Sequence, residues 1–293
     1  MTAGPHERED AMTYSLVARS ADGAELGAAT ASKYLAVGAT VPAVSAGHGA
    51  LVTQAHTNVA FREEGLALLR AGVPAEEAVQ ILVQGDAGRA RRQLAVLGTT
   101  GEPAVWTGEL CSEAAGHLVG TDCVAIGNLM AGATVLEAMV EAFTAAPGKL
   151  AERLLLALAA GERAGGDRRG RQSAAVLVLG AGDHDRLRSP ARTDLRVDDH
   201  PEPVAELRRL LELHRVVVSG PERATALPLD GETAAEVDRL LQVSGHAAGG
   251  LVERLSIWAH SENLEHRLLA DAVDAAVLER LRDRAGGLRR PAG

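Results

Sequence analysis

Residues 12–33 read MTYSLVARSADGAELGAATASK, and this stretch decides the expected fold. Thr13–Arg19 has the alternating pattern that is typical of a strand. Ser20–Gly23 ends in an Asp-Gly pair, which favours a tight turn between two strands. Glu25–Ala31 has the pattern of the returning strand. The stretch therefore predicts an antiparallel hairpin.

The hairpin also predicts which side chains meet. With the Asp-Gly pair at the centre of the turn, Thr13 faces Ser32 and Ser15 faces Thr30. Lys33 then lies beside the beginning of the first strand, and it is one of two lysines in a chain with 28 arginines. A lysine can activate a neighbouring hydroxyl nucleophile. Thr13, Ser15, Ser32 and Lys33 are therefore candidate catalytic residues. The alternative is a Ser/Thr-rich strand with a surface lysine.

Composition excludes several classes of protein. The chain has 293 residues, of which 46% are hydrophobic, too many for a disordered chain. A net charge of -9 argues against a general nucleic-acid binder, and no apolar run reaches the ~18 residues of a membrane span. Cys111 and Cys123 have no metal-binding or disulfide spacing, and the polar first residues do not resemble a signal peptide. We therefore expect a cytoplasmic protein with reduced thiols that binds neither nucleic acid nor membrane.

Strands and pairs of helices alternate after the hairpin. Apolar stretches at 34–44 and 50–55 continue the run of antiparallel strands. Further strands are expected at 93–98, 103–107, 123–127, 173–179 and 194–197, and helices at 61–71, 75–83, 134–144, 149–160 and 201–214. This order predicts a layered α/β fold. A doubly wound nucleotide-binding fold is disfavoured, because no Gly-x-Gly-x-x-Gly follows a strand and no P-loop is present.

A boundary is expected near residues 219–221, which read Ser-Gly-Pro. After it, Thr233–Glu236 has a capping-box pattern at the start of a helix, and Leu251–Leu269 and Ala272–Leu281 are expected to be helical. The predicted parts are a disordered leader at 1–11, a main domain at 12–218 and a small helical module at 219–293.

Two polar segments point to a site beyond the hairpin. Thr53–Asn58 reads TQAHTN, and Gly127 and Asn128 stand together later in the chain. Side-chain amides and backbone N–H groups can form an oxyanion hole, so Asn58 and Asn128 are candidates for that role. His56 is a candidate for substrate binding. The alternative is that both segments are polar strand ends and turns.

A basic loop precedes an apolar strand at residues 165–173, which read GGDRRGRQS. Arginines between glycines can hold a carboxylate or phosphate by two hydrogen bonds, and an aspartate can orient a guanidinium or bind an amine. The candidate substrate-binding residues here are Asp167, Arg168, Arg171, Gln172 and Ser173. The alternative is a solvated loop.

Residues 198–200 read Asp-Asp-His, a set that suggests a metal ion. Consecutive residues of a strand point to opposite faces, so one ion can rarely take all three. We therefore favour Asp199 as the cap of a helix that starts near Pro201. No metal ion and no cofactor are expected.

The motifs at 12–19, 31–38, 53–58, 127–128, 165–175 and 196–201 together resemble the family of unknown function DUF1028, over about Met12–His214. That family is classed with the N-terminal nucleophile (Ntn) hydrolases, so the resemblance implies a four-layer αββα sandwich. Leu227–Glu232, Trp258 and Glu262–Glu265 are similar to a peptidoglycan-binding-like module that some members carry.

The resemblance implies that Thr13 is a nucleophile whose free α-amine is the base, with a pKa of about 7.7–8.0 in a model peptide. Three possibilities remain open because eleven residues precede Met12. Met12 is the true start, the leader is cleaved, or an internal hydroxyl activated by Lys33 acts without an amine. Ser15 is the alternative nucleophile, since it shares a strand face with Thr13.

The expected activity is hydrolysis of a C–N bond in a small amide or peptide, with the basic loop binding an anionic group. The alternative is a catalytically inactive Ntn fold that serves as a binding or scaffold protein. A homo-oligomer is expected.

Overall fold

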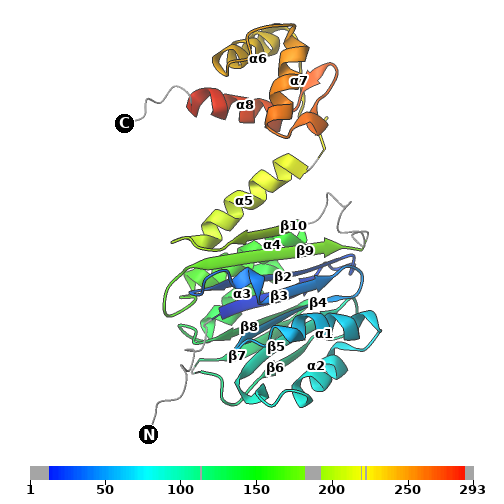
Figure 1. The fold of residues 1–293 in the computed structure, drawn as a ribbon, viewed down its shortest axis with the longest axis vertical. Helices are drawn as coiled ribbons and strands as arrows, with labels where there is room; N and C mark the ends of the chain where they lie inside the picture. The colour runs from blue at the N-terminus through cyan, green and yellow to red at the C-terminus, as the bar shows by residue number, and fades with distance from the viewer. Residues whose placement is uncertain (1–12, 113, 182–192, 219, 222, 288–293) are drawn as a thin grey trace. The chain divides into compact units, whose positions relative to one another are not determined.

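The computed structural model describes residues 13–112, 114–181, 193–218, 220–221 and 223–287. The predicted leader at 1–11 lies outside the described residues. Within them the protein is a mixed α/β structure with eight α-helices and three antiparallel sheets (Figure 1). The chain divides into two compact units, one extending to Leu211 and the other beginning at Glu212.

The first unit is built around a six-stranded sheet with the order β10-β9-β2-β1-β8-β7. Its strands are β1 (Thr13–Arg19), β2 (Glu25–Ser32), β7 (Gly116–Gly120), β8 (Cys123–Asn128), β9 (Ser173–Gly180) and β10 (Thr193–Val197). The hairpin register is confirmed, because Ser15 pairs with Thr30. Gly23 has a φ of 68° at the turn, where a residue without a side chain is favoured. β7 is not among the expected strands, since five residues bounded by glycines give a weak pattern.

A second sheet has the order β3-β4-β5-β6. Its strands are β3 (Pro42–Ser45), β4 (Gly49–Ala55), β5 (Arg92–Gly98) and β6 (Ala104–Thr107). The prediction of a strand over 34–44 is wrong except for its last residues. Ala36 adopts a left-handed φ of 54°, and Val37–Ala39 forms a short 3-10 helix. Gly38 in that turn lies so close to β9 that an added Cβ would be 2.4 Å from the Cβ of Ala175.

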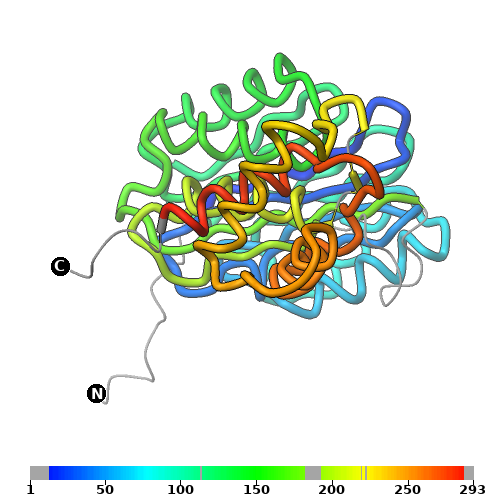
Figure 2. The backbone as a smooth tube through the Cα atoms, turned by 90° about the horizontal axis from the view of Figure 1, so that it is seen from above, coloured from blue at the N-terminus to red at the C-terminus, as the bar shows by residue number. Residues whose placement is uncertain are grey.

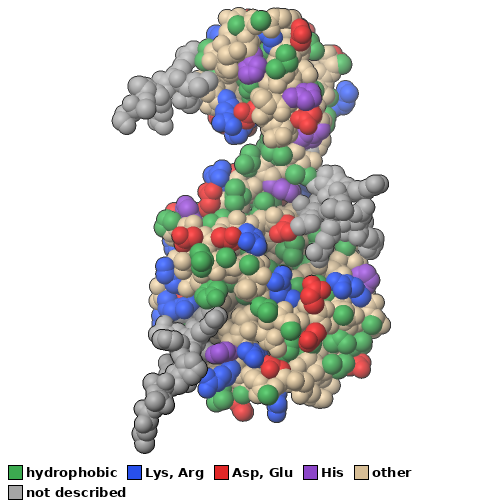
Figure 3. All heavy atoms as spheres, in the orientation of Figure 1, with side chains coloured by type: hydrophobic (Ala, Val, Ile, Leu, Met, Phe, Trp, Pro, Cys, Tyr) green, Lys and Arg blue, Asp and Glu red, His purple; other side chains and the backbone are tan. Residues whose placement is uncertain are grey.

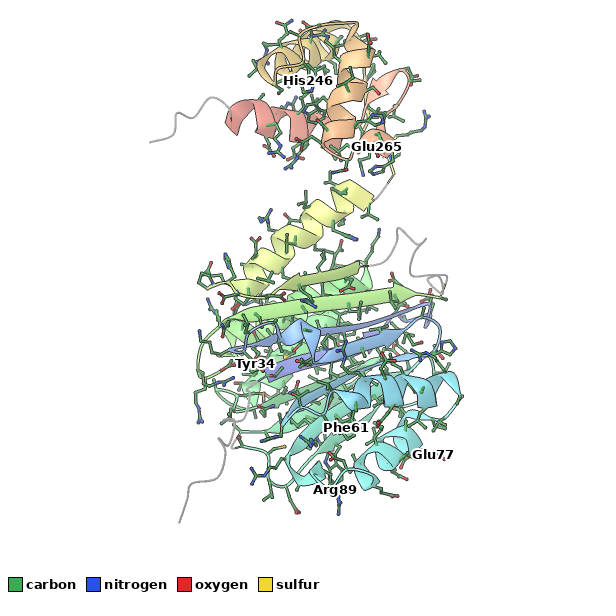
Figure 4. The ribbon with its side chains drawn as sticks, viewed as in Figure 1. Tyr34, Phe61, Glu77, Arg89, His246 and Glu265 are labelled. Atoms are coloured by element: carbon green, nitrogen blue, oxygen red, sulfur yellow. The ribbon has the colours of Figure 1, made fainter. Side chains whose placement is uncertain are left out.

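Helices cover the outer face of each sheet, on opposite sides of the first unit (Figure 2). Their bounds are α1 (Ala60–Arg70), α2 (Ala75–Gln84), α3 (Thr134–Ala145), α4 (Leu150–Arg163) and α5 (Pro203–Val218). α1 and α2 pack on the four-stranded sheet around Phe61, which is labelled in Figure 4. α3, α4 and the first turns of α5 pack on the six-stranded sheet around Leu16 and Leu154.

The inner faces of the two sheets bury a separate core. Val17, Leu26, Val52, Leu97 and Ile126 are all fully buried within it. The strands are apolar on both faces over most of their length, because one face meets helices and the other meets a sheet. The buried members of this core are alanine, valine, leucine and isoleucine, in keeping with the low aromatic content of the chain.

The two cysteine thiols differ in burial. Cys123 is fully buried on β8, and desolvation raises the pKa of its thiol to about 11, whereas Cys111 is half-buried. Because the thiolate is the reactive form, we expect a disulfide reagent at pH 8 to modify Cys111 and to spare Cys123 in the folded protein. Both should react in denaturant. A Cys111→Ser variant that still reacts at the rate of the native protein would contradict this assignment.

The second unit is a small helical module around buried Trp258. Its elements are β11 (Leu227–Pro228), α6 (Gly231–Val243), α7 (Leu251–Ser261), β12 (Ala272–Val273) and α8 (Ala275–Gly287). Three helix boundaries differ from expectation. The helix predicted over 272–281 begins at Ala275, because Ala272 and Val273 form β12. The residue before α6 is Asp230, so Thr233 lies inside the first turn and is not the cap. The helix predicted over 251–269 ends at Ser261, and Asn263 adopts a left-handed φ of 59°.

Candidate functional site

The layer between the two sheets changes from apolar to polar at one end. There β1, β2, β4, β5 and β8 each place uncharged polar side chains on their inner faces. These side chains are Thr13, Ser15, Thr30, Ser32, Gln54, Gln93 and Asn128, each at most 3% exposed. We call this set the inner polar cluster. A buried polar group is stable only where it is hydrogen-bonded, so its bonding pattern is informative.

Thr13 belongs to the cluster at the start of β1. It is the first residue of β1, and its partner on β8 is Asn128. On the other side its hydroxyl lies 3.4 Å from that of Ser32 on β2. The structure thus brings together three of the residues predicted to be catalytic. Ser15, two residues along the same strand face, donates a hydrogen bond of 2.6 Å to Gln54 and lies 2.8 Å from the Thr30 hydroxyl.

Two glutamines on the facing sheet join these groups. Gln54 on β4 donates its amide to the carbonyl of Thr13 at 2.9 Å and to Oε1 of Gln93 at 3.0 Å. Gln93 on β5 accepts a further bond of 2.9 Å from Nδ2 of Asn128 and donates to the carbonyl of Gly127 at 2.9 Å. The two sheets are therefore linked by side-chain amides at this end.

The glutamines are the residues that sequence reasoning missed. Gln54 stands in the TQAHTN motif and Gln93 opens a predicted strand. Each occupies an inward position of a strand that is otherwise apolar on that face, next to Val52 and Ala95. Period-2 alternation is a signal that could have identified them, because it places i and i+2 on one face.

Lys33 lies at the edge of the cluster and is exposed. Its backbone N–H donates to the carboxylate of Asp167 at 2.6 Å, and its ammonium donates to the carbonyl of Arg171 at 3.2 Å. Lys33 therefore ties the end of β2 to the basic loop. Tyr34, labelled in Figure 4, follows it and is 44% exposed.

The arginines of the basic loop have acidic partners. Arg169 pairs with the buried carboxylate of Asp167 at 3.2 Å. Arg171 pairs with Glu162 at 2.6 Å and with Glu202 at 3.7 Å. Arg168 is exposed. Across the face displayed in Figure 3, basic and acidic side chains are likewise interspersed.

A cavity of about 110 Å3 lies between this loop and the outer face of β1 and β2. Tyr14, Ser32, Glu162, Asp167 and Arg171 are among its lining residues. Burial, with Glu162 and Asp167 nearby, raises the pKa of the Tyr14 hydroxyl, so it stays a neutral donor. Burial also raises the pKa of Glu162, although Arg171 opposes this shift. The cavity thus offers polar groups of both signs to a small ligand.

The other predicted residues lie in two places. Asn58 is half-buried before α1, where its amide oxygen accepts the N–H of Ala60 at 3.2 Å. His56 follows β4, and its carbonyl accepts a bond from the guanidinium of Arg92. The described contacts of these two residues do not include Thr13 or Ser15. The motif at 53–58 is thus divided between the cluster and the start of a helix.

Gln172 and Ser173 connect the basic loop to neighbouring backbone and side chains. Ser173 donates its hydroxyl to the carbonyl of Tyr34 and accepts the N–H of Val37 at 3.0 Å. Gln172 donates to Asp199 at 3.2 Å. These bonds hold the loop against the turn that follows β2.

Side chains of the Asp-Asp-His segment at 198–200 form contacts that do not involve a metal site. Asp198 pairs with Arg196 at 2.8 Å, and Nδ1 of His200 accepts the N–H of Glu202 at 3.0 Å before α5. Asp199 accepts the bond from Gln172, and no described bond joins it to an N–H of α5, so the predicted cap at Asp199 is not seen. Among the residues that the structure describes, no group of three His, Cys, Asp or Glu side chains is placed to hold a metal ion.

Comparisons with known proteins relate the chain to one family. The model of a family of unknown function (DUF1028) matches residues 13–207. The crystal structure of a DUF1028 protein from Silicibacter pomeroyi is 32% identical in sequence with a TM-score of 0.63, over 76% of this chain and 88% of that one. A search of curated proteins found no match. In the described part of the chain, none of the helices combines the length and apolar character needed to traverse a bilayer.

Proposed function

The chain belongs to the DUF1028 family, and we propose that it is an Ntn-type amidohydrolase in which Thr13 is the nucleophile. The observation that carries the proposal is the position of Thr13 at the first residue of β1, between Ser32 and Asn128 in the inner polar cluster. The two facing sheets with helices on both outer faces support assignment to the αββα Ntn sandwich. The proposal requires that the chain preceding Thr13 be removed.

The chemistry follows from a free Thr13 amine. The amine takes the proton of the Thr13 hydroxyl while Oγ1 bonds to the carbonyl carbon of an amide. The C–N bond then breaks, the leaving amine takes that proton, and an acyl-enzyme remains. Water, deprotonated by the same amine, attacks the ester and releases the acid and Thr13. The remaining hydrogen on Nδ2 of Asn128 can stabilise the oxyanion.

The basic loop is proposed to bind the substrate. Lys33 and Asp167 join the loop to the end of β2, one residue beyond Ser32. Arg168 offers an exposed guanidinium, and a guanidinium binds a carboxylate through two parallel bonds. We therefore propose a small amide or peptide with an anionic group as the substrate.

An electrophile can test the nucleophile without a known substrate. A β-lactone should acylate Thr13 of protein whose first residue is Thr13, adding the mass of one lactone to the N-terminal peptide. Thr13→Val removes the hydroxyl at nearly constant volume, and labelling should fall at least ~100-fold, a lower bound for the loss of a covalent nucleophile. Thr13→Ser should retain it. Peptide mass spectrometry measures the result.

A matched control removes a hydroxyl elsewhere. Thr144 lies on α3, where its hydroxyl bonds only along the helix to the carbonyl of Val140 in the described contacts. Thr144→Val should be labelled like the native protein. Equal labelling of Thr13→Val and the native protein would exclude Thr13 as the nucleophile.

One observation favours the alternative of a binding or scaffold protein. In the full chain Thr13 is only 3% exposed, so its hydroxyl is closed to a substrate in that form. Intact mass of the natively expressed protein distinguishes the two functions. A mass that begins at Thr13 supports the hydrolase, whereas a chain that retains Met1–Met12 supports the scaffold. We also propose that residues 219–293 form a separate helical module.

A further inference from the structure

The orientation of the buried amides is determined by two backbone carbonyls. Nε2 of Gln93 lies 2.9 Å from the carbonyl oxygen of Gly127 and 3.2 Å from that of Gly116. A carbonyl oxygen only accepts hydrogen bonds, so the amide of Gln93 must present its nitrogen to both. Oε1 of Gln93 then faces Gln54 and Asn128, and each of these must present its own nitrogen.

This orientation has a consequence for Ser15. Because Nε2 of Gln54 points to Gln93 and to the carbonyl of Thr13, its Oε1 faces the hydroxyl of Ser15 at 2.6 Å. Ser15 is therefore the donor in that bond. An amide oxygen is too weak a base to take the proton, so Ser15 holds the cluster together and is not activated as a nucleophile.

The same orientation leaves one acceptor open. Nδ2 of Asn128 is directed to Gln93, so Oδ1 points away from it. Oδ1 is buried and has no hydrogen-bond partner among the described residues, although Asn128 is only 1% exposed. Leaving such a buried acceptor unsatisfied is unfavourable, and a hydrogen-bond donor would remove that cost.

The start of β1 lies directly opposite Asn128 and offers a position for that donor. Asn128 is the direct partner of Thr13 across the β1–β8 pair, and both side chains are on the inner face. Directly opposed residues have Cβ atoms about 4.5–5.5 Å apart, within reach of a side-chain amide. A primary amine at Thr13 would carry N–H groups into this space.

We propose that Asn128, in addition to the oxyanion role of its Nδ2, positions the base: its Oδ1 accepts a hydrogen bond from the α-amine of Thr13, and Gln93 imposes this orientation. The inference rests on the proposed function, since it requires a free amine. The bond would direct the nitrogen lone pair toward Oγ1 of Thr13, the atom whose proton the amine must take. Gln54 completes the arrangement by holding the carbonyl of Thr13.

The groups that face the amine differ between the two sides of the sheet. On the inner face, β2, β4, β5 and β8 contribute Ser32, Gln54, Gln93 and Asn128, which are all uncharged. The charged or titratable groups lie on the outer side and at the sheet edge, and they are Tyr14, Lys33, Glu162, Asp167 and Arg171. Asn128 is thus a position on the inner face where one new charge would act directly on the amine.

The test is titration of the amine itself. The protein is labelled with 15N-threonine and expressed from Met12 and, as a Thr2→Ala variant, from Met1, so that a labelled α-amine reports on Thr13 and not on Thr2. The α-amine resonance, which lies far from the backbone amides, is followed against pH. We expect Asn128→Asp to raise the pKa of the amine, because a carboxylate favours the ammonium form. Asn128→Leu and Gln93→Met should lower it, because each removes the oriented acceptor.

Two controls separate the possible failures. Gln84→Glu adds the same charge at an exposed position of α2 in the first unit, where solvent screens it, and should leave the pKa of the amine unchanged. Identical titrations of the native protein and both Asn128 variants, with folding verified by circular dichroism, would overturn the positioning role while leaving Thr13 as a possible nucleophile. If neither expressed chain has a free-amine resonance, the proposed function fails and the inference fails with it.

Discussion

Replacing Gln93 by leucine is expected to lower the free energy of unfolding of the first unit by about 3–5 kcal/mol. Leucine fills a similar volume but leaves the amides of Gln54 and Asn128 without their shared acceptor and the carbonyl of Gly127 without its donor. Each buried group that loses its partner costs about 1–3 kcal/mol. The bonds lie in one network, so the losses act together.

Urea denaturation, monitored through hydrogen exchange of peptides from β4 and β5, measures this change in the free energy of unfolding. Gln84→Leu is the matched control, because Gln84 is exposed at the end of α2. That variant should change the free energy of unfolding by less than about 0.5 kcal/mol, as is usual for surface positions. Equal stability of the Gln93 and Gln84 variants would show that the cluster does not hold the two sheets together.

Asp274→Ala is expected to destabilise the second unit by about 3–5 kcal/mol. Asp274 forms a nearly fully buried ion pair with Arg267 at 3.0 Å and accepts the N–H of Ala276 at 2.9 Å at the start of α8. Removal of the carboxylate leaves a buried guanidinium without its counter-charge, a change that typically costs 3–5 kcal/mol. The helix cap is lost as well.

Fluorescence of buried Trp258 in a Trp106→Phe background reports unfolding of this unit. Asp283→Ala, on the exposed side of α8, is the control and should have little effect. The double variant Arg267→Met, Asp274→Leu should recover much of the lost stability, because an apolar pair replaces the ion pair without leaving a charge. A single Asp274→Ala variant as stable as the Asp283→Ala control would contradict this account.

The contrast between Lys33 and Gln93 shows what could be predicted about the site. Lys33 stands out in composition, and the hairpin register places it correctly at the end of β2. Its ammonium, however, donates to the carbonyl of Arg171, and no described bond joins it to Thr13. Gln93 is unremarkable in the sequence, yet it is the residue on which the buried amides converge.

Local pattern was sufficient for the hairpin from Thr13 to Ser32 and for most helices, because strand alternation and turn chemistry are determined within a few residues. It was insufficient for 34–41, where a left-handed residue and contact with β9 replace the expected strand. The inner polar cluster likewise depends on which strands pair and which faces meet. Thr13 and Asn128 are adjacent only because β1 pairs with β8, and Gln54 reaches Thr13 only because a second sheet packs on the first. Such contacts between residues far apart in the chain are set by tertiary packing, which no local pattern encodes.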